Sequence, residues 1–147
     1  MKKVIDRNKI LSKLDEIGLY LDELEEIKPA DFEEYRKSIV KKRSCERLLQ
    51  ISVESVIDIC NVIVANLRLG VPYDEDVLFE KLIDKDIISK KTGMILRKMK
   101  GFRNILVHKY GEVDNEKVFE HLGELNDFEV FKNEILKFLN NSSRGCN

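Results

Sequence analysis

A chain of 147 residues, 43% of them hydrophobic and 36% charged, is long enough to bury the core of one domain. Its formal net charge of −1 argues against wholesale electrostatic binding to nucleic acid or an anionic membrane, so any such binding needs a local concentration of charge. The three cysteines show no C-x-x-C spacing, and neither a signal-peptide pattern nor an apolar run of about 20 residues is visible, so we expect a soluble, cytoplasmic protein.

The N-terminal part of the chain predicts an amphipathic helix. From Ile10 to Leu24 apolar residues recur at alternating steps of four and three, which places them on one helical face, and Pro29 ends the pattern. Asp31 is typical of a helix N-cap, because Glu34 three residues later completes the spacing of a capping box. A second helix is therefore expected to begin at this point.

The longest stretch without glycine or proline, residues 32–69, exceeds the length of an average helix. We therefore expect a break near Ser44. The second half of the stretch, residues 48–69, is apolar on most sides and predicts the central buried helix of the domain. Cys60 is expected to be a small core residue of this helix.

Shorter helices are predicted in the second half of the chain. Residues 73–86 predict a short acidic helix, and Ser89 has the features of a cap for a helix with an apolar stripe at steps of four and three. Two more helical patterns follow Asp114, separated by a break at residues 126–127. No convincing pair of strands is found. Residues 1–140 therefore predict a single all-α domain, an antiparallel bundle of about five to six helices, and residues 141–147 a disordered tail.

Charge is segregated between two neighbouring segments. Residues 73–86 contain six acidic and two basic side chains, whereas residues 89–110 contain seven Lys or Arg residues and no acid. One interpretation is a local surface that attracts phosphate groups. The other is that these cations face solvent and pair with neighbouring acidic helices.

The segment from Gly101 to Gly111 places several reactive or phosphate-binding side chains at the end of this basic helix. Asn104 and His108 are four residues apart and share a helical face, while Arg103 is offset from His108 by about 140°, a gap that its long side chain can bridge. Arginine can hold a phosphate and stabilise developing charge, and histidine can exchange protons near neutral pH. These groups suit metal-independent cleavage of RNA, in which a 2′-hydroxyl attacks the adjacent phosphate.

A single histidine is insufficient for this reaction, because the base and the acid must act on opposite sides of phosphorus. A symmetric homodimer with two copies of the motif across one cleft would supply both groups. No compact set of His, Cys and carboxylate ligands is visible, so we expect neither a metal nor another cofactor for cleavage.

The chain resembles the HEPN superfamily and, more narrowly, the HepT-type toxins encoded beside minimal nucleotidyltransferases of the MntA type. The resemblance covers roughly residues 5–140 and rests on the stretches ERLLQISVESVIDI, GVPYDED and, above all, GFRNILVHKY. Arg103, His108 and Tyr110 match the R-x-x-x-x-H-x-Y motif of that family without a departure in spacing.

The resemblance implies a helical homodimer with the two motifs at the dimer cleft, acting as the toxin of a type VII-like toxin–antitoxin pair. Arg103 and His108 would be the ribonuclease residues. Tyr110 would accept AMP that an MntA-like nucleotidyltransferase transfers from ATP, which neutralises the toxin. A phosphate and an adenine beside Arg103 would occupy the site that an RNA phosphate needs.

Other polar residues have two interpretations each. Glu54, Asp58 and Asn61 form a stripe on the central helix that either orients the motif or faces solvent, and Asp58 is the favoured orienting residue because a carboxylate can fix an imidazole tautomer. Asn104 either contacts a phosphate or occupies an exposed helix position. His121 lies among apolar residues and is expected to be a packing residue.

A different class of function remains open. The helical domain could be a non-catalytic partner module of a minimal nucleotidyltransferase that binds nucleotide or RNA phosphates through Arg103. Phosphate binding and phosphate cleavage use the same groups, so the motif alone does not separate these two functions.

Overall fold

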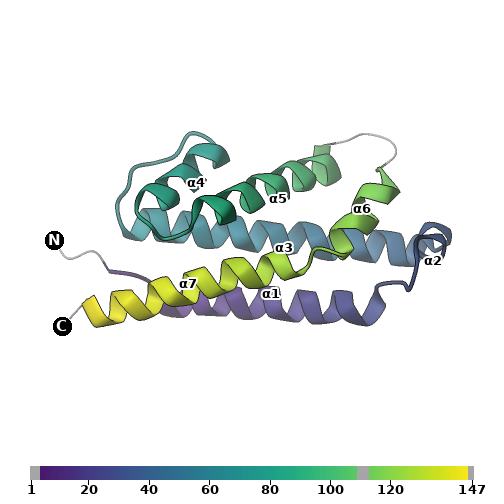
Figure 1. Ribbon diagram of the computed structural model, residues 1–147, viewed down its shortest axis with the longest axis horizontal. Helices are drawn as coiled ribbons and strands as arrows, with labels where there is room; N and C mark the ends of the chain where they lie inside the picture. Colours follow the sequence, from purple (N-terminus) through teal and green to yellow (C-terminus); the bar gives the residue numbers. More distant parts are fainter. Residues whose placement is uncertain (1–3, 109–112, 146–147) are drawn as a thin grey trace.

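The computed structural model describes residues 4–108 and 113–145, with side chains described for residues 4–107 and 113–142. Within these ranges the chain forms seven α-helices and no β-strand, which confirms the all-α prediction (Figure 1). The helices are α1 (Arg7–Ile27), α2 (Phe32–Lys37), α3 (Ile39–Asn66), α4 (Glu75–Asp84), α5 (Lys90–His108), α6 (Asn115–Leu122) and α7 (Asn126–Gly145).

The long helix α3 is the centre of the bundle. It contacts α1 most extensively, and α2, α4, α5 and α6 also pack on it. Figure 1 shows α1 along one side of α3, with α4 and α5 along the other. The start of α1 and the end of α7 lie at the same end of the molecule, where the Arg7 guanidinium donates to the Leu139 carbonyl at 3.1 Å.

Side-chain caps account for several helix starts. The carboxylate of Asp31 accepts from the Glu34 backbone N–H at 2.8 Å, as predicted, and Asp74 makes the equivalent 2.8 Å contact with Val77. The Ser89 hydroxyl accepts from the Thr92 N–H at 3.1 Å and thereby caps α5. Each cap satisfies a backbone donor that has no partner within its own helix.

The predicted break near Ser44 is wrong, because α3 runs through this residue without interruption. The break lies at Ser38, whose backbone leaves the helical region at φ −106° and ψ 109° and whose hydroxyl accepts from the Lys41 N–H at 3.2 Å. Serine competes for backbone hydrogen bonds at either position, so composition alone did not distinguish them.

Two boundaries near the C-terminal end also differ from the prediction. The last break falls at residues 123–125, one turn earlier than expected, and Asn126 is already the first residue of α7. The segment expected to form a disordered tail is helical as far as Gly145. Leu139 is the last buried core residue of α7 in the described part of the chain.

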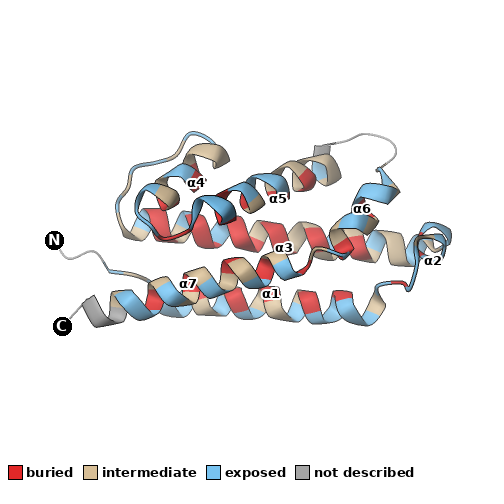
Figure 2. Ribbon diagram, viewed as in Figure 1, coloured by how far each residue is buried: buried red, intermediate tan, exposed pale blue. Residues whose placement is uncertain are grey.

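Helix α3 supplies more of the buried hydrophobic core than any other helix, and Figure 2 shows its buried positions along the middle of the helix. By length and composition α3 could cross a membrane, although no uninterrupted apolar run marks it in the sequence. More than half of its most apolar window is buried within the bundle, as in the core helix of a helical domain. Cys60 is fully buried there, as predicted, and this burial raises the pKa of its thiol.

Candidate functional site

The helix that contains most of the predicted site, α5, forms a hairpin with α4 against α3. The ammonium of Lys81 on α4 donates to the Leu69 carbonyl after the end of α3 at 2.8 Å. On the facing side, a Cβ atom at Gly93 would lie 2.5 Å from Cδ1 of Ile83, so glycine allows α5 to approach α4 closely. These contacts fix the position of α4 beside α5.

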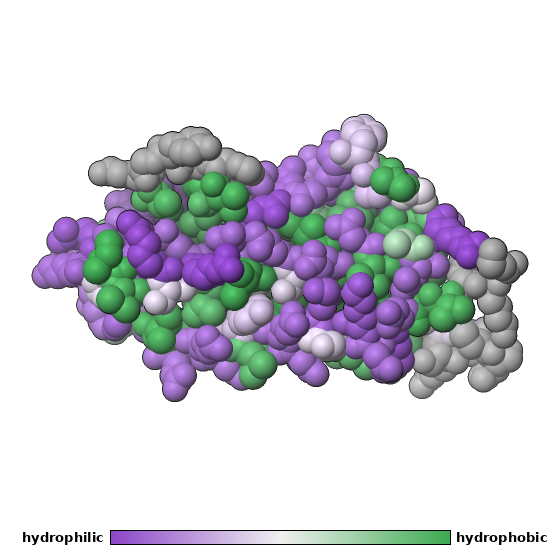
Figure 3. All heavy atoms as spheres, turned by 180° about the vertical axis from the view of Figure 1, so that it is seen from behind, coloured by the Kyte–Doolittle hydropathy of each residue, from purple (hydrophilic) through white to green (hydrophobic). Residues whose placement is uncertain are grey.

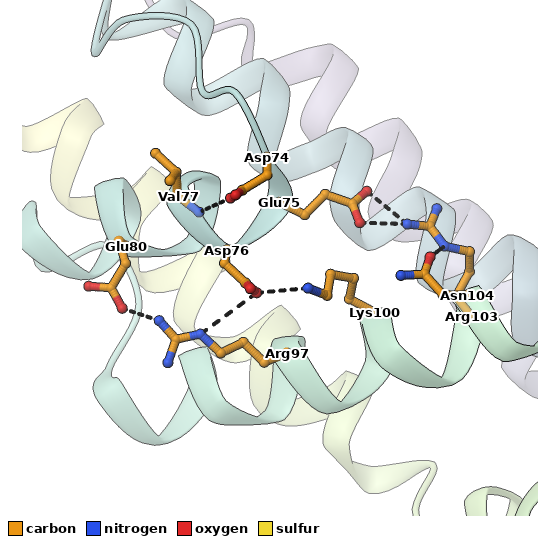
Figure 4. A network of polar contacts seen from close by, with 9 residues as sticks. All are labelled: Asp74, Glu75, Asp76, Val77, Glu80, Arg97, Lys100, Arg103 and Asn104. Atoms are coloured by element: carbon orange, nitrogen blue, oxygen red, sulfur yellow. Dashed lines mark hydrogen bonds and ion pairs between the residues drawn. The ribbon is translucent and has the colours of Figure 1, made fainter.

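Arg103 is held from two sides near the C-terminal end of α5 (Figure 4). Its Nη2 lies 2.6 Å and 2.8 Å from the two carboxylate oxygens of Glu75, the first residue of α4. Its Nε donates to Oδ1 of Asn104 at 3.0 Å. The side chain of Arg103 is 16% exposed and that of Glu75 is 30% exposed, so the pair is partly shielded from water.

Two further cations of α5 also face acids of α4 (Figure 4). The Lys100 ammonium lies 3.0 Å from Asp76, and Arg97 contacts both Asp76 and Glu80. The interpretation that the basic residues pair with an acidic neighbour is therefore confirmed on this side of the helix. Because each pair largely cancels its own charge, these cations do not form a free phosphate-attracting surface.

The remaining described cations of α5 lie elsewhere. Lys98 hydrogen-bonds Glu124, and this contact raises the pKa of the lysine. Lys90 and Lys91, at the start of α5, are exposed and form no ion pair within the described part of the chain. Helical rise places them about 18 Å or more from Arg103, which leaves the region around Arg103 close to neutral.

The histidine and tyrosine of the motif are only partly accessible to structural analysis. His108 is the last residue of α5, and its side chain lies outside the described residues. Tyr110 and Gly111 lie outside them altogether. Helix geometry puts Asn104 between Arg103 and His108 around the helix, at about 100° from the former and 40° from the latter. The contact of Nε with Asn104 therefore draws the guanidinium toward the side of α5 that contains His108.

The polar stripe of α3 is not gathered at Arg103. The Asp58 carboxylate contacts the ammonium of Lys13 on α1 at 3.3 Å, so the expectation that it supports the motif is not met. Figure 1 shows α1 and α5 on opposite sides of α3. Glu54 accepts from Gln50 at 3.1 Å, and the Asn61 amide donates to its own helix at the Ile57 carbonyl. The alternative that the stripe is a polar outer side of α3 fits these contacts.

His121 is a packing residue, as predicted. Its ring stacks on Phe102 with ring centroids 3.9 Å apart and an interplanar angle of 27°. Burial lowers the pKa of His121, because the charged imidazolium would lose its hydration there. The contact supports the apolar side of α5 directly behind Arg103.

One described side chain of the motif is suited to binding a phosphate. Among residues 4–107 and 113–142, no three His, Cys, Asp or Glu side chains come close enough together to bind a metal ion. Arg103, in contrast, offers a fixed guanidinium with its Nη1 edge uncontacted by other described side chains. Such a group can bind a phosphate oxygen and stabilise charge that develops on it.

Glu75 is the site residue that the sequence did not identify. The signal was present, because the acidic segment 73–86 precedes the basic segment by a short connection that predicts a helical hairpin. Which acid meets which base depends on the register of the two helices, and the spacing of residues along the chain does not specify that register.

The chain is similar in sequence to a family of ribonucleases. A profile of the ribonuclease HepT-like family matches residues 17–135. The tRNA nuclease HepT of Aphanizomenon flos-aquae is 29% identical over 131 residues, which cover 88% of this chain and 89% of that protein. The mRNA nuclease HepT of Shewanella oneidensis is 30% identical over 124 residues, which cover 83% of this chain and 92% of that protein.

A solved structure shows the same architecture. The tri-AMPylated HEPN toxin of Shewanella oneidensis, in complex with an MNT antitoxin, matches with a TM-score of 0.81 and 28% sequence identity. The match covers 88% of this chain and 97% of the toxin. The profile match to residues 17–135 includes the whole α4–α5 hairpin, so Arg103, Asn104 and His108 lie within it.

Proposed function

Because the chain belongs to the ribonuclease HepT-like family, we propose that it is an endoribonuclease and the toxin of a toxin–antitoxin pair in the cytoplasm. The main observation behind this proposal is the burial of Arg103 and the contacts that orient it. It is a half-buried arginine whose guanidinium is oriented by Asn104 and Glu75, and it stands five residues before His108 in the helix that matches nuclease relatives.

The reaction that these groups support is cleavage by the RNA itself. The 2′-oxygen attacks the neighbouring phosphorus and the bond to the 5′-oxygen breaks, leaving a 2′,3′-cyclic phosphate and a 5′-hydroxyl. One His108 accepts the proton of the 2′-hydroxyl, and a second His108 protonates the departing 5′-oxygen. Arg103 stabilises the negative charge on the non-bridging phosphate oxygens, so the cleavage needs no metal.

The second histidine comes from a second copy of the chain, so the active form is a homodimer. Figure 3 shows the opposite face from Figure 1, where apolar atoms are interspersed with hydrophilic ones. Sedimentation at micromolar concentration tests this step, and a monomer that cleaves RNA contradicts it.

Regulation falls to a nucleotidyltransferase antitoxin of the MntA type, which uses ATP to transfer AMP to Tyr110. The AMPylated state of the similar Shewanella toxin supports this part of the proposal. After incubation with ATP and the transferase, the intact mass of the chain is expected to rise by units of AMP. A Tyr110→Phe chain that gains the same mass would show that another residue is the acceptor.

The decisive experiment is RNA cleavage in the presence of a chelator. His108→Ala and Arg103→Ala are each expected to slow cleavage at least about 100-fold. Arg97→Ala is the matched control, because it removes another arginine of α5 that contacts the same helix α4. Equal cleavage by all four chains would contradict the assignment. RNA binding without cleavage by the parent would favour the non-catalytic partner module.

A further inference from the structure

The ion pair between Glu75 and Arg103 differs from its neighbours on the same hairpin. Both oxygens of Glu75 contact a single nitrogen, Nη2, at 2.6 Å and 2.8 Å. The side chains of Arg97 and Glu80, the arginine pair further along the hairpin, are 42% and 50% exposed, compared with 16% and 30% for Arg103 and Glu75. The Glu75 contact is therefore the better shielded of the two and restrains its arginine more strongly.

The position of Glu75 is itself fixed by the backbone. It is the first residue of α4, directly after Asp74, whose carboxylate caps the helix at Val77. The last turn of α4 is tied to the chain just after α3, where the Lys81 ammonium donates to the Leu69 carbonyl. Glu75 thus approaches Arg103 from a rigid element and not from a flexible loop.

The three nitrogens of the Arg103 guanidinium have different surroundings. Nη2 is held by Glu75 and Nε is held by Asn104, whereas Nη1 contacts none of the other described side chains. A planar group held at two of its three nitrogens cannot rotate, so the remaining N–H bonds keep one direction (Figure 4). This direction is what a transition-state contact requires, because preorganised donors lose little reorganisation energy during the reaction.

The same carboxylate has an opposite effect on binding. Glu75 cancels much of the positive charge of Arg103, so it weakens the attraction for an RNA phosphate. Glu75 therefore has two opposing effects: it favours the orientation of Arg103 and disfavours the binding of RNA. A group that only stabilised the fold would affect neither quantity in a specific direction.

We propose that Glu75 is a positioning residue of the ribonuclease site. It fixes Arg103 in the orientation used for phosphodiester cleavage, and its negative charge lowers the affinity for RNA. The inference rests on the proposed function, because it assigns a role to Glu75 in that same reaction. It adds a residue that lies 28 positions before Arg103 and belongs to a different helix.

The test is the kinetics of Glu75→Gln on an oligoribonucleotide substrate. The amide has the shape of the carboxylate but lacks its charge, so we expect kcat to fall about tenfold and KM to fall about threefold. Binding of the same oligonucleotide with 2′-deoxy substitution at the cleaved position, measured by fluorescence anisotropy, is expected to tighten by a similar threefold factor. Thermal unfolding verifies that the variant is folded.

Glu80→Gln is the matched control, since it removes an acid from the same helix and an ion pair with the same partner helix. We expect its kcat to equal that of the parent. If Glu75→Gln keeps the kcat of the parent, or if Glu80→Gln loses as much, the inference is overturned while the proposed function stands. If the folded parent cleaves no RNA, the proposed function is overturned and the inference with it.

Discussion

The two ends of α5 are held by different kinds of contact. At the N-terminal end, the carboxylate of Glu134 on α7 accepts from the Ser89 N–H at 2.6 Å, from the Ser89 hydroxyl at 3.0 Å and from the Thr92 hydroxyl at 2.6 Å. At the C-terminal end, Arg103 is held by Glu75 through opposite charges. The first contact uses neutral donors at the positive end of a helix dipole, and the second uses two charges that cancel.

This difference separates stability from function along one helix. Thr92 is fully buried, so the loss of its acceptor would leave a hydroxyl without a partner in the interior. Arg103 is partly exposed, and its Nη1 can meet a phosphate while Glu75 holds Nη2. We therefore expect substitutions at the start of α5 to change folding and substitutions near its end to change catalysis.

The largest expected effect is on catalysis. Arg103→Lys keeps the positive charge but loses the planar fork that contacts Glu75 and Asn104 together. We expect single-turnover cleavage to slow about 100-fold, while the free energy of unfolding changes by less than about 1 kcal/mol. A lysine chain with parental cleavage would show that charge alone suffices and would remove the contrast between the two ends of α5.

The next effect is on stability. Glu134→Ala removes three hydrogen bonds at the start of α5 and is expected to lower the free energy of unfolding by about 2–3 kcal/mol in urea titrations. Glu129→Ala is the matched control, because it removes an exposed acid from the same helix. The cleavage rate per folded molecule is expected to remain parental in both variants. Equal stability of the two variants would contradict the role of Glu134.

A smaller effect depends on pH and concerns the apolar side of α5. Because the pKa of His121 is lower in the folded chain, the unfolded chain binds more protons, and stability falls as the pH drops below the unfolded value of about 6.5. We expect His121→Gln to lose less unfolding free energy than the parent between pH 7 and pH 5. An identical pH dependence in the two chains would exclude His121 as a source of this loss.

The smallest effect is expected from the exposed pair of Arg97 and Glu80. Because both side chains are about half exposed, Glu80→Gln should change the free energy of unfolding by less than about 0.5 kcal/mol. Added salt should reduce even this difference, since exposed charges are screened. A loss close to that of Glu134→Ala would mean that the ion pairs with α4 are structural after all.

Local patterns in the sequence predicted the helices and the core well. The steps of four and three identified the buried face of α1, and Asp31 and Ser89 capped helices as expected, because these signals depend on neighbours within one or two turns. The break at Ser38 was predicted at the wrong serine, because local signals alone do not separate Ser38 from Ser44. Nothing in the immediate surroundings of Ser38 and Ser44 determines which of them leaves the helix.

The site was predictable to the extent that it is local. Arg103 and Asn104 are neighbours in the chain, and their mutual contact follows from that. The partners of Glu75 and Asp58 depend on which helices face each other, and local patterns do not specify this. The contact of Glu75 with Arg103 was therefore not predicted, and Asp58 was expected near the motif but pairs with Lys13. The roles of His108 and Tyr110 stay predictions, since the Tyr110 position and the His108 side chain fall outside the described residues.

The contacts of α7 determine when the bundle can be completed during synthesis of the chain. Arg7 is bound by a carbonyl 132 positions later in the chain, and the start of α5 is held by a residue 45 positions after Ser89. A ribosome therefore completes the helix that contains Arg103 well before it makes the residues that fasten this helix to the bundle. We expect the nascent chain to remain without a finished site at Arg103 until its last helix has emerged.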